Sequence, residues 1–182
     1  MAEKKTHFGR AGEYFAMSEL LLRGWNVAVP VVDVGDDIFV IDDNDKTTLR
    51  LQVKSAEAKR DGDSFRAKFN LSRRQLRTPQ RIELIFMLVV RTADGWRFLV
   101  IPREALFAIR SRHVAAAQGA PKIGRPPTAG DDATTDTLGL EITISPTDAS
   151  AWSASMTSYL DSWPDALPVV KGGPGTVGAT VA

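Results

Sequence analysis

The chain has 182 residues, of which 43% are hydrophobic and 25% charged, a composition typical of one globular domain with a hydrophobic core. It contains no cysteine, which excludes disulfides, thiolate metal sites and a cysteine nucleophile. The net charge of +1 hides an uneven distribution, because residues 1–113 hold 20 basic against 15 acidic side chains and residues 114–182 hold 3 against 7.

The sequence has no segment that resembles a membrane span or an export signal. The longest purely apolar run, Leu84–Val90, has seven residues, whereas a membrane helix needs about 20. No apolar segment with a small-residue cleavage site follows the N-terminal residues. We therefore expect a cytoplasmic protein.

The first predicted elements are a helix and three strands. Residues 8–24 are rich in helix formers and end at a glycine, which predicts a helix. Glu13 lies on one stripe of this helix with apolar residues at i+3, i+4 and i+7, so its carboxylate faces packed structure and needs a partner. β-Branched, alternating segments predict strands, with a hairpin turn before the last, at residues 25–32, 37–41 and 48–54.

The third predicted strand has one apolar and one polar face, because successive side chains of a strand point in opposite directions. The expected core face holds Leu49, Leu51 and Val53. The expected polar face holds Arg50, Gln52 and Lys54.

The remainder of the chain completes a mixed fold. A strand at 64–71, a basic helical turn at 72–76, strands at 82–90 and 96–101 and a helix from Pro102 to about Arg112 follow in order. This order predicts the α/β (α+β) class, with a central mixed β-sheet flanked by helices. The domain organisation is then a core at 1–113, a linker at 114–137, a closing edge strand and helix at 138–164, and a disordered tail at 165–182.

The closing helix is predicted from large residues at near-helical spacing within 149–163. These residues are expected to pack rather than to bind a ligand: Trp152, Met156, Leu160 and Trp163.

Three polar residues of the strand region could meet in a site for a divalent metal. Asp37 begins one short strand, Gln52 offers a carbonyl oxygen on the next, and Lys54 follows on the same face. Oxygen-liganded Mg²⁺ can neutralise a phosphate, activate a water and stabilise a leaving oxygen. An ammonium beside the water can orient it, and Glu13 could add a ligand. The chemistry expected of such a site is phosphodiester hydrolysis.

The motifs Gly12-Glu13, Asp33-Val-Gly-Asp-Asp37 and Gln52-Val-Lys54, in this order and spacing, resemble the PD-(D/E)XK nuclease superfamily. Within it, the chain looks most like small bacterial endonucleases, a group that includes homing endonucleases and is similar to Holliday junction resolvases. The resemblance covers roughly residues 8–110. It implies a restriction-endonuclease-like fold, dependence on Mg²⁺ or Mn²⁺, DNA as the substrate with RNA as the alternative, and a homodimer or tetramer.

Transferred onto this sequence, the resemblance makes Asp37 the principal metal ligand, with Asp36 as the second choice. Lys54 becomes the catalytic lysine and Glu13 the helix acid. Gln52 stands where the superfamily has an acid, so the site carries one fewer negative charge and should bind its metal more weakly. A nuclease fold that has lost cleavage and binds nucleic acid or a partner is therefore the alternative, and a chance motif in an unrelated domain would leave these residues apart.

A basic segment follows the predicted site. Lys54–Arg81 carries nine basic residues against three acids, which is typical of a surface that faces phosphates, although a solvated charged face is an equal alternative. The candidate phosphate contacts are Lys59, Arg60, Arg73, Arg74 and Arg77.

Overall fold

The computed structural model describes residues 2–32, 35–42, 47–79, 81–119 and 136–163, which form two five-stranded sheets and three α-helices. The first sheet, called sheet A, has the strand order β1 (Asn26–Ala28), β2 (Ile38–Asp42), β3 (Thr47–Glu57), β6 (Leu84–Thr92) and β7 (Gly95–Pro102). The second, called sheet B, has the order β10 (Ala154–Ser155), β9 (Ala149–Ala151), β8 (Thr137–Ile144), β5 (Ser64–Ser72) and β4 (Lys59–Asp61).

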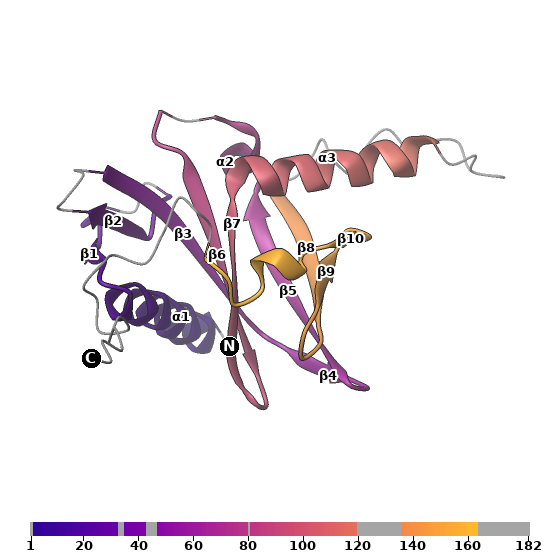
Figure 1. Ribbon diagram of the computed structural model, residues 1–182, viewed down its shortest axis with the longest axis horizontal. Coiled ribbons are helices and arrows are strands. Elements are labelled where there is room, and N and C mark those ends of the chain that lie inside the picture. The colour runs from indigo at the N-terminus through magenta and orange to yellow at the C-terminus, as the bar shows by residue number, and fades with distance from the viewer. Residues whose placement is uncertain (1, 33–34, 43–46, 80, 120–135, 164–182) are drawn as a thin grey trace, which may run out of the picture.

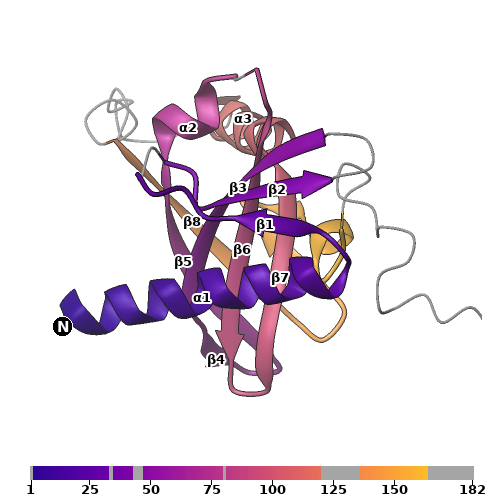
Figure 2. The same ribbon diagram turned by 90° about the vertical axis from the view of Figure 1, so that its left-hand side faces the viewer.

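The helices are α1 (Ala2–Leu22), α2 (Arg73–Arg77) and α3 (Arg103–Gly119). Helix α1 covers one face of sheet A, and sheet B packs on the other face (Figure 1). Helices α2 and α3 lie at the end of the molecule opposite to β4, as both views show (Figure 2). Among the described helices, none is long and apolar enough to cross a membrane.

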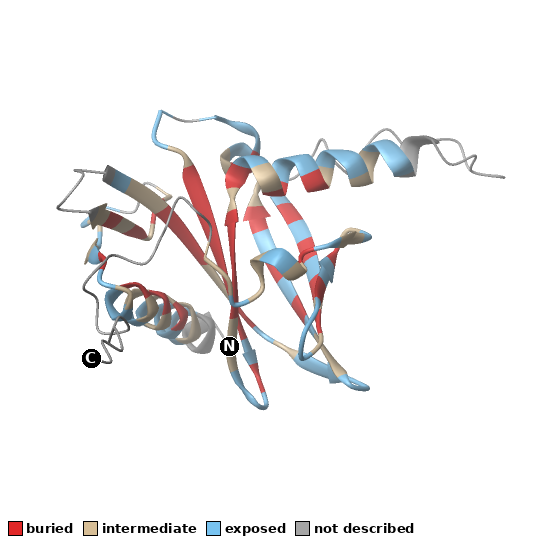
Figure 3. Ribbon diagram, in the orientation of Figure 1, coloured by how far each residue is buried: buried red, intermediate tan, exposed pale blue. Residues whose placement is uncertain are grey.

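Two hydrophobic cores flank sheet A, and β6 contributes to both. Its residues from Leu84 to Val90 are all buried, as Figure 3 shows for the centre of the molecule. Ile85, Met87 and Val89 pack towards α1, whereas the alternate side chains pack towards sheet B and α3. An uninterrupted apolar run is the pattern of a strand covered on both faces.

Sheet A is mixed. Strand β3 runs parallel to β6, whereas the pairs β1–β2, β2–β3 and β6–β7 are antiparallel. The predicted α/β (α+β) class, with a mixed sheet flanked by helices, is confirmed. Sheet B is an addition that the sequence patterns did not indicate as a separate layer.

The predicted helix at 149–163 is wrong. This segment forms β9, β10 and a 3-10 turn at Thr157–Tyr159. Trp152 and Ser153 have φ angles of 49° and 58° and make a tight turn between β9 and β10, which no α-helix could contain. The large residues do pack, with Met156 fully buried between the sheets, because a hairpin followed by a turn can also space core residues three or four apart.

Other boundaries also differ from the predictions. Strand β8 is not an edge strand, because it lies between β5 and β9. Helix α3 continues to Gly119, into the expected linker. Strand β1 is shorter than the predicted strand and ends at Ala28, and Val29, Val31 and Val32 beyond it are exposed. Most of the expected linker and tail, residues 120–135 and 164–182, lies outside the described residues.

Candidate metal and catalytic site

Helix α1 crosses β3 at a point where only a glycine fits. A Cβ atom built on Gly12 would lie 2.5 Å from Cβ and 2.8 Å from Oγ of Ser55, distances that real side chains do not adopt. Gly12 is buried, and Ser55 donates a hydrogen bond to the Phe8 carbonyl. The neighbouring residue, Glu13, is thereby held beside β3.

Asp37 lies just before the ladder that joins β2 to β3. The first residue of β2, Ile38, pairs with Leu51 of β3. The backbone N–H of Asp37, one residue earlier, donates to the Leu51 carbonyl at 2.9 Å. Its carboxylate oxygen Oδ2 accepts hydrogen bonds from the backbone N–H of Val53, at 2.7 Å, and from Nε2 of Gln52. The carboxylate is therefore fixed beside β3, just before β2 begins.

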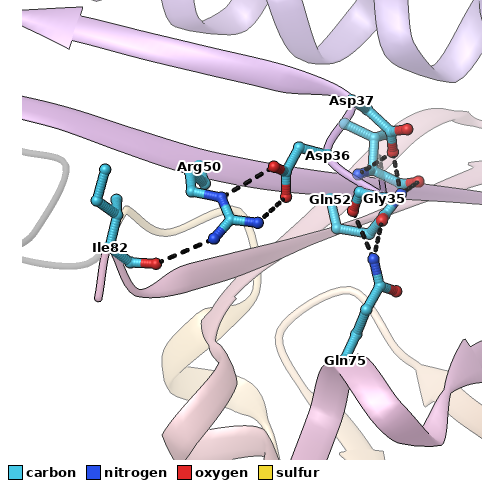
Figure 4. A network of polar contacts seen from close by, with 8 residues as sticks. Gly35, Asp36, Asp37, Arg50, Gln52, Gln75 and Ile82 are labelled. Carbon is cyan, nitrogen blue, oxygen red and sulfur yellow. Dashed lines mark hydrogen bonds and ion pairs between the residues drawn. The ribbon is translucent and has the colours of Figure 1, made fainter. Parts of the chain in front are cut away.

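Gln52 is only 3% exposed and both ends of its carboxamide are engaged. Nε2 donates to Asp37, and Oε1 accepts a hydrogen bond of 2.8 Å from Nε2 of Gln75 on α2. Nε2 of Gln75 also donates to the Gly35 carbonyl (Figure 4). The predicted polar face of β3 is therefore covered at this point rather than open to solvent.

Asp36, the second choice for the metal ligand, has a different partner. Its carboxylate is 4% exposed and receives two hydrogen bonds from the Arg50 guanidinium, at 2.6 Å and 2.9 Å (Figure 4). Arg50 also reaches the Ile82 carbonyl at 3.5 Å. This bidentate pair joins the segment before β2 to β3, and the adjacent Asp37 is left directed at Gln52.

Glu13 forms an ion pair with Arg10, one turn earlier on α1. The hydrogen bond and the charge of Glu13 raise the pKa of Arg10, and the Asp37 carboxylate adds a smaller contribution in the same direction. Arg10 therefore lies within electrostatic range of both predicted carboxylates.

Lys54 is half-buried and lies two residues beyond Gln52 on the same face of β3. The register places these two residues beside Leu88 and Phe86 of β6. The structure thus joins Asp37 to Gln52 directly and places Lys54 on the Gln52 face. Glu13 lies on α1, which covers the opposite face of sheet A, and its ion-pair partner is Arg10.

The five predicted phosphate contacts fall into two groups at opposite ends of sheet B. Lys59 and Arg60 belong to β4, which pairs with the first residues of β5, whereas the other three belong to α2, which follows the last residue of β5 (Figure 1). A nine-residue strand such as β5 spans about 30 Å. The members of the second group, close to the Gln75 contact with Gln52, are Arg73, Arg74 and Arg77.

The oxygens around Asp37 are of the kind that Mg²⁺ and Mn²⁺ prefer. Nε2 of Gln52 lies beside Asp37 Oδ2 and 3.5 Å from the Val53 carbonyl oxygen, so the positive end of an amide dipole lies between two oxygens. A cation in place of this NH₂ group would face the same two oxygens, which makes Asp37 Oδ2 and the Val53 carbonyl the candidate ligands. In the parts of the chain that are described, no three His, Asp or Glu side chains are grouped so that they could hold a metal ion.

Sequence reasoning missed two partners of the predicted site residues: Gln75, which contacts Gln52, and Arg10, which pairs with Glu13. Gln75 lies 23 residues after Gln52 in a segment that stands out only for its positive charge. The sequence weakly indicates the pairing of Arg10 with Glu13, because the two residues lie three apart on the same helix face.

Comparisons with known proteins give only weak likenesses, all to solved structures. No protein-family model matches the chain, and no curated protein matches it. One similar solved structure is that of a bacterial homing endonuclease, with 21% sequence identity and a TM-score of 0.41 over 57% of this chain and 72% of that chain. At this level of similarity the function of the chain is inferred from its own residues.

Proposed function

We propose that the protein is a metal-dependent endonuclease that hydrolyses DNA phosphodiester bonds at a site built from Glu13, Asp37, Gln52 and Lys54. The observation that carries this proposal is the fixed position of the Asp37 carboxylate. It is hydrogen-bonded to the Gln52 side chain and to the Val53 backbone, just beyond the pairing of β3 with β2. A carboxylate, an amide, a backbone carbonyl and a nearby ammonium form a compact set of groups suited to a metal, a water and a phosphate.

Each residue of this group has a distinct proposed role. Asp37 would bind the metal, with Oε1 of Gln52 and the Val53 carbonyl as further ligands, and Lys54 would orient the attacking water. A bound Mg²⁺ or Mn²⁺ would supply charge neutralisation and an activated water. Glu13, which pairs with Arg10 on α1, would accept a hydrogen bond from a ligand water or bind the metal itself. The same motif order in PD-(D/E)XK nucleases is consistent with these roles.

The surface next to the group favours a polyanionic substrate. Helix α2 contributes Gln75 to the Gln52 network and carries Arg74 on its exposed side. A guanidinium next to the site would contact a phosphate of a bound nucleic acid. We expect the α2 side, rather than β4, to guide the DNA backbone to Asp37.

Cleavage by purified protein tests the proposal. Wild type is incubated with supercoiled, linear, single-stranded and branched DNA, with Mg²⁺, with Mn²⁺ and with EDTA. We expect nicking or cutting with either metal and none with EDTA. Asp37→Asn keeps an acceptor for the Val53 N–H and Lys54→Met keeps an apolar stem, so both variants should fold. Both should cut at least about a hundredfold more slowly, as expected when a metal ligand or general acid–base group is removed.

The control is Asp63→Ala, which removes one exposed charge beside β4, at the opposite end of sheet B. This variant should cut at the wild-type rate. Cleavage that persisted in both Asp37→Asn and Lys54→Met would assign the activity to another site or to a contaminating enzyme, and the proposal would fail.

A second candidate function is binding without cleavage. The observation in its favour is that Gln52 is neutral and already satisfies Asp37, while Arg10 satisfies Glu13. Such a protein would bind DNA equally well with and without a divalent metal and would cut none of the four substrates. The cleavage experiment separates the two functions.

A further inference from the structure

We propose that Gln75 is a positioning residue that controls which atom of the Gln52 carboxamide faces Asp37. The inference rests on the proposed function, because it concerns how the chain prepares that metal site. Gln75 lies on α2, outside the residues expected to bind the metal, and contacts both Gln52 and the segment that leads into Asp37.

The direction of the hydrogen bonds in this network follows from its two terminal acceptors, the Asp37 carboxylate and the Gly35 carbonyl. A carboxylate can only accept hydrogen bonds, so Gln52 presents its NH₂ group to Asp37. Oε1 of Gln52 then faces Gln75, which must present its own NH₂ group. That NH₂ group also serves the Gly35 carbonyl, which likewise can only accept. Each amide orientation therefore dictates the next one, from Asp37 to Gly35.

We call the chain of hydrogen bonds from Asp37 through Gln52 and Gln75 to Gly35 the amide relay. Backbone groups hold Gln75 and Gly35, its last two members, in place. Gly35 has a φ angle of +93°, and a Cβ built on it would lie 2.6 Å from Nε2 of Gln75. The backbone N–H of Gln75 donates to Oγ of Ser72 at 3.2 Å, which caps the start of α2. Both the main chain and the side chain of Gln75 are thereby anchored, and its amide can change orientation only by giving up a hydrogen bond.

Binding a cation beside Asp37 requires the Gln52 and Gln75 amides to take the opposite orientation. Gln52 would have to turn its amide so that Oε1, rather than the NH₂ group, faces the Asp37 carboxylate. Its NH₂ group would then face Gln75, which must present Oε1 in turn and give up its hydrogen bond to Gly35. Gln75 therefore stabilises the orientation in which Gln52 does not bind a metal, and both amides must turn together.

Nuclear magnetic resonance of the full chain tests this coupling. The side-chain NH₂ signals of Gln52 and Gln75 are assigned by their disappearance in Gln52→Met and Gln75→Met, and the wild type is titrated with Mg²⁺. We expect both pairs of signals to shift with one midpoint. A shift of the Gln52 signals alone, or no shift of either while Mg²⁺-dependent cleavage occurs, overturns the relay and leaves the proposed function standing. The absence of both shift and cleavage overturns both.

A substitution at position 75 gives an independent measurement. In Gln75→Glu the side chain can accept from the Gln52 NH₂ group but cannot donate to Oε1, so Gln52 is biased towards the metal-binding orientation. The Kd for Mn²⁺, measured by calorimetry, should fall about threefold to tenfold, the range of one hydrogen bond. Thr78→Glu places the same charge one turn away at an exposed position and should change the Kd less. An unchanged or higher Kd in Gln75→Glu, or an equal fall in Thr78→Glu, overturns the relay.

Discussion

Gly12 of α1 and Ser55 of β3 pack so closely that any side chain at position 12 would overlap the Ser55 side chain, at 2.5 Å between the two Cβ atoms. This close approach sets the distance between α1 and β3 two residues beyond Val53, whose backbone N–H donates to the Asp37 carboxylate. The glycine that precedes the helix acid is explained by packing, without any role in the chemistry.

Gly12→Ala should destabilise the protein even though alanine is the better helix former by about 1 kcal/mol. Overpacking costs about 1–3 kcal/mol, and a Cβ has no flexible end that could move aside. Gly9→Ala in the same helix is the control, because its Cβ would meet no atom within 4 Å, and it should be neutral or stabilising. Urea unfolding of both variants provides the measurement, and a smaller cost of Gly12→Ala in a Ser55→Gly background would confirm the steric overlap.

Gly35→Ala should disturb the candidate site as well as the fold. The substitution places a side chain at φ +93° and within 2.6 Å of Gln75 Nε2, so Gln75 must move away from Gly35 and Gln52. Gly62→Ala, with φ +60° and no atom within 4 Å of its Cβ, carries only the backbone cost, which is about 1–3 kcal/mol for such conformations. We expect a shift of the Gln52 side-chain NH₂ signals in Gly35→Ala alone. Unshifted Gln52 signals would show that Gln75 is not required to hold this amide.

Arg50→Met should unfold at distinctly lower urea concentration than wild type. The substitution leaves Asp36, which is 4% exposed, without its bidentate partner. Breaking a buried ion pair costs about 3–5 kcal/mol, and the 17% exposure of Arg50 places the expected destabilisation at about 2–4 kcal/mol. The ion pair of Arg66 with Asp61 is about half exposed, so Arg66→Met should cost less than about 1 kcal/mol. Equal destabilisation of the two variants would contradict a structural role of the Asp36 pair.

Arg74→Ala and Lys59→Ala remove one exposed positive charge from opposite ends of sheet B. If DNA approaches over α2, Arg74→Ala should weaken binding severalfold, whereas Lys59→Ala should have little effect. The slope of log K against log salt should decrease by about 0.9, because the variant neutralises one fewer phosphate. Fluorescence anisotropy at several salt concentrations measures both quantities. A larger effect of Lys59→Ala would place the DNA at β4 instead.

The sequence alone determined the local part of the candidate site. Asp37 and Gln52 belong to strands that follow each other along the chain, and a short acidic connection predicts their antiparallel pairing. Strand alternation then separates the apolar side chains of Leu51 and Val53 from Gln52, as the structure confirms. Both inferences depend on interactions between near neighbours in sequence, for which residue periodicity is a direct physical signal.

The tertiary structure decided what covers that strand and which polar groups meet there. Sheet B, the contact of Gln75 with Gln52 and the pairing of Asp36 with Arg50 all arise from segments brought together by packing. Near-helical spacing at 149–163 was misleading for the same reason, because the burial of Met156 between two sheets overrides local periodicity. Hydrogen-bond partners depend on which donors and acceptors packing leaves within about 3 Å, and no local pattern of residues records that distance.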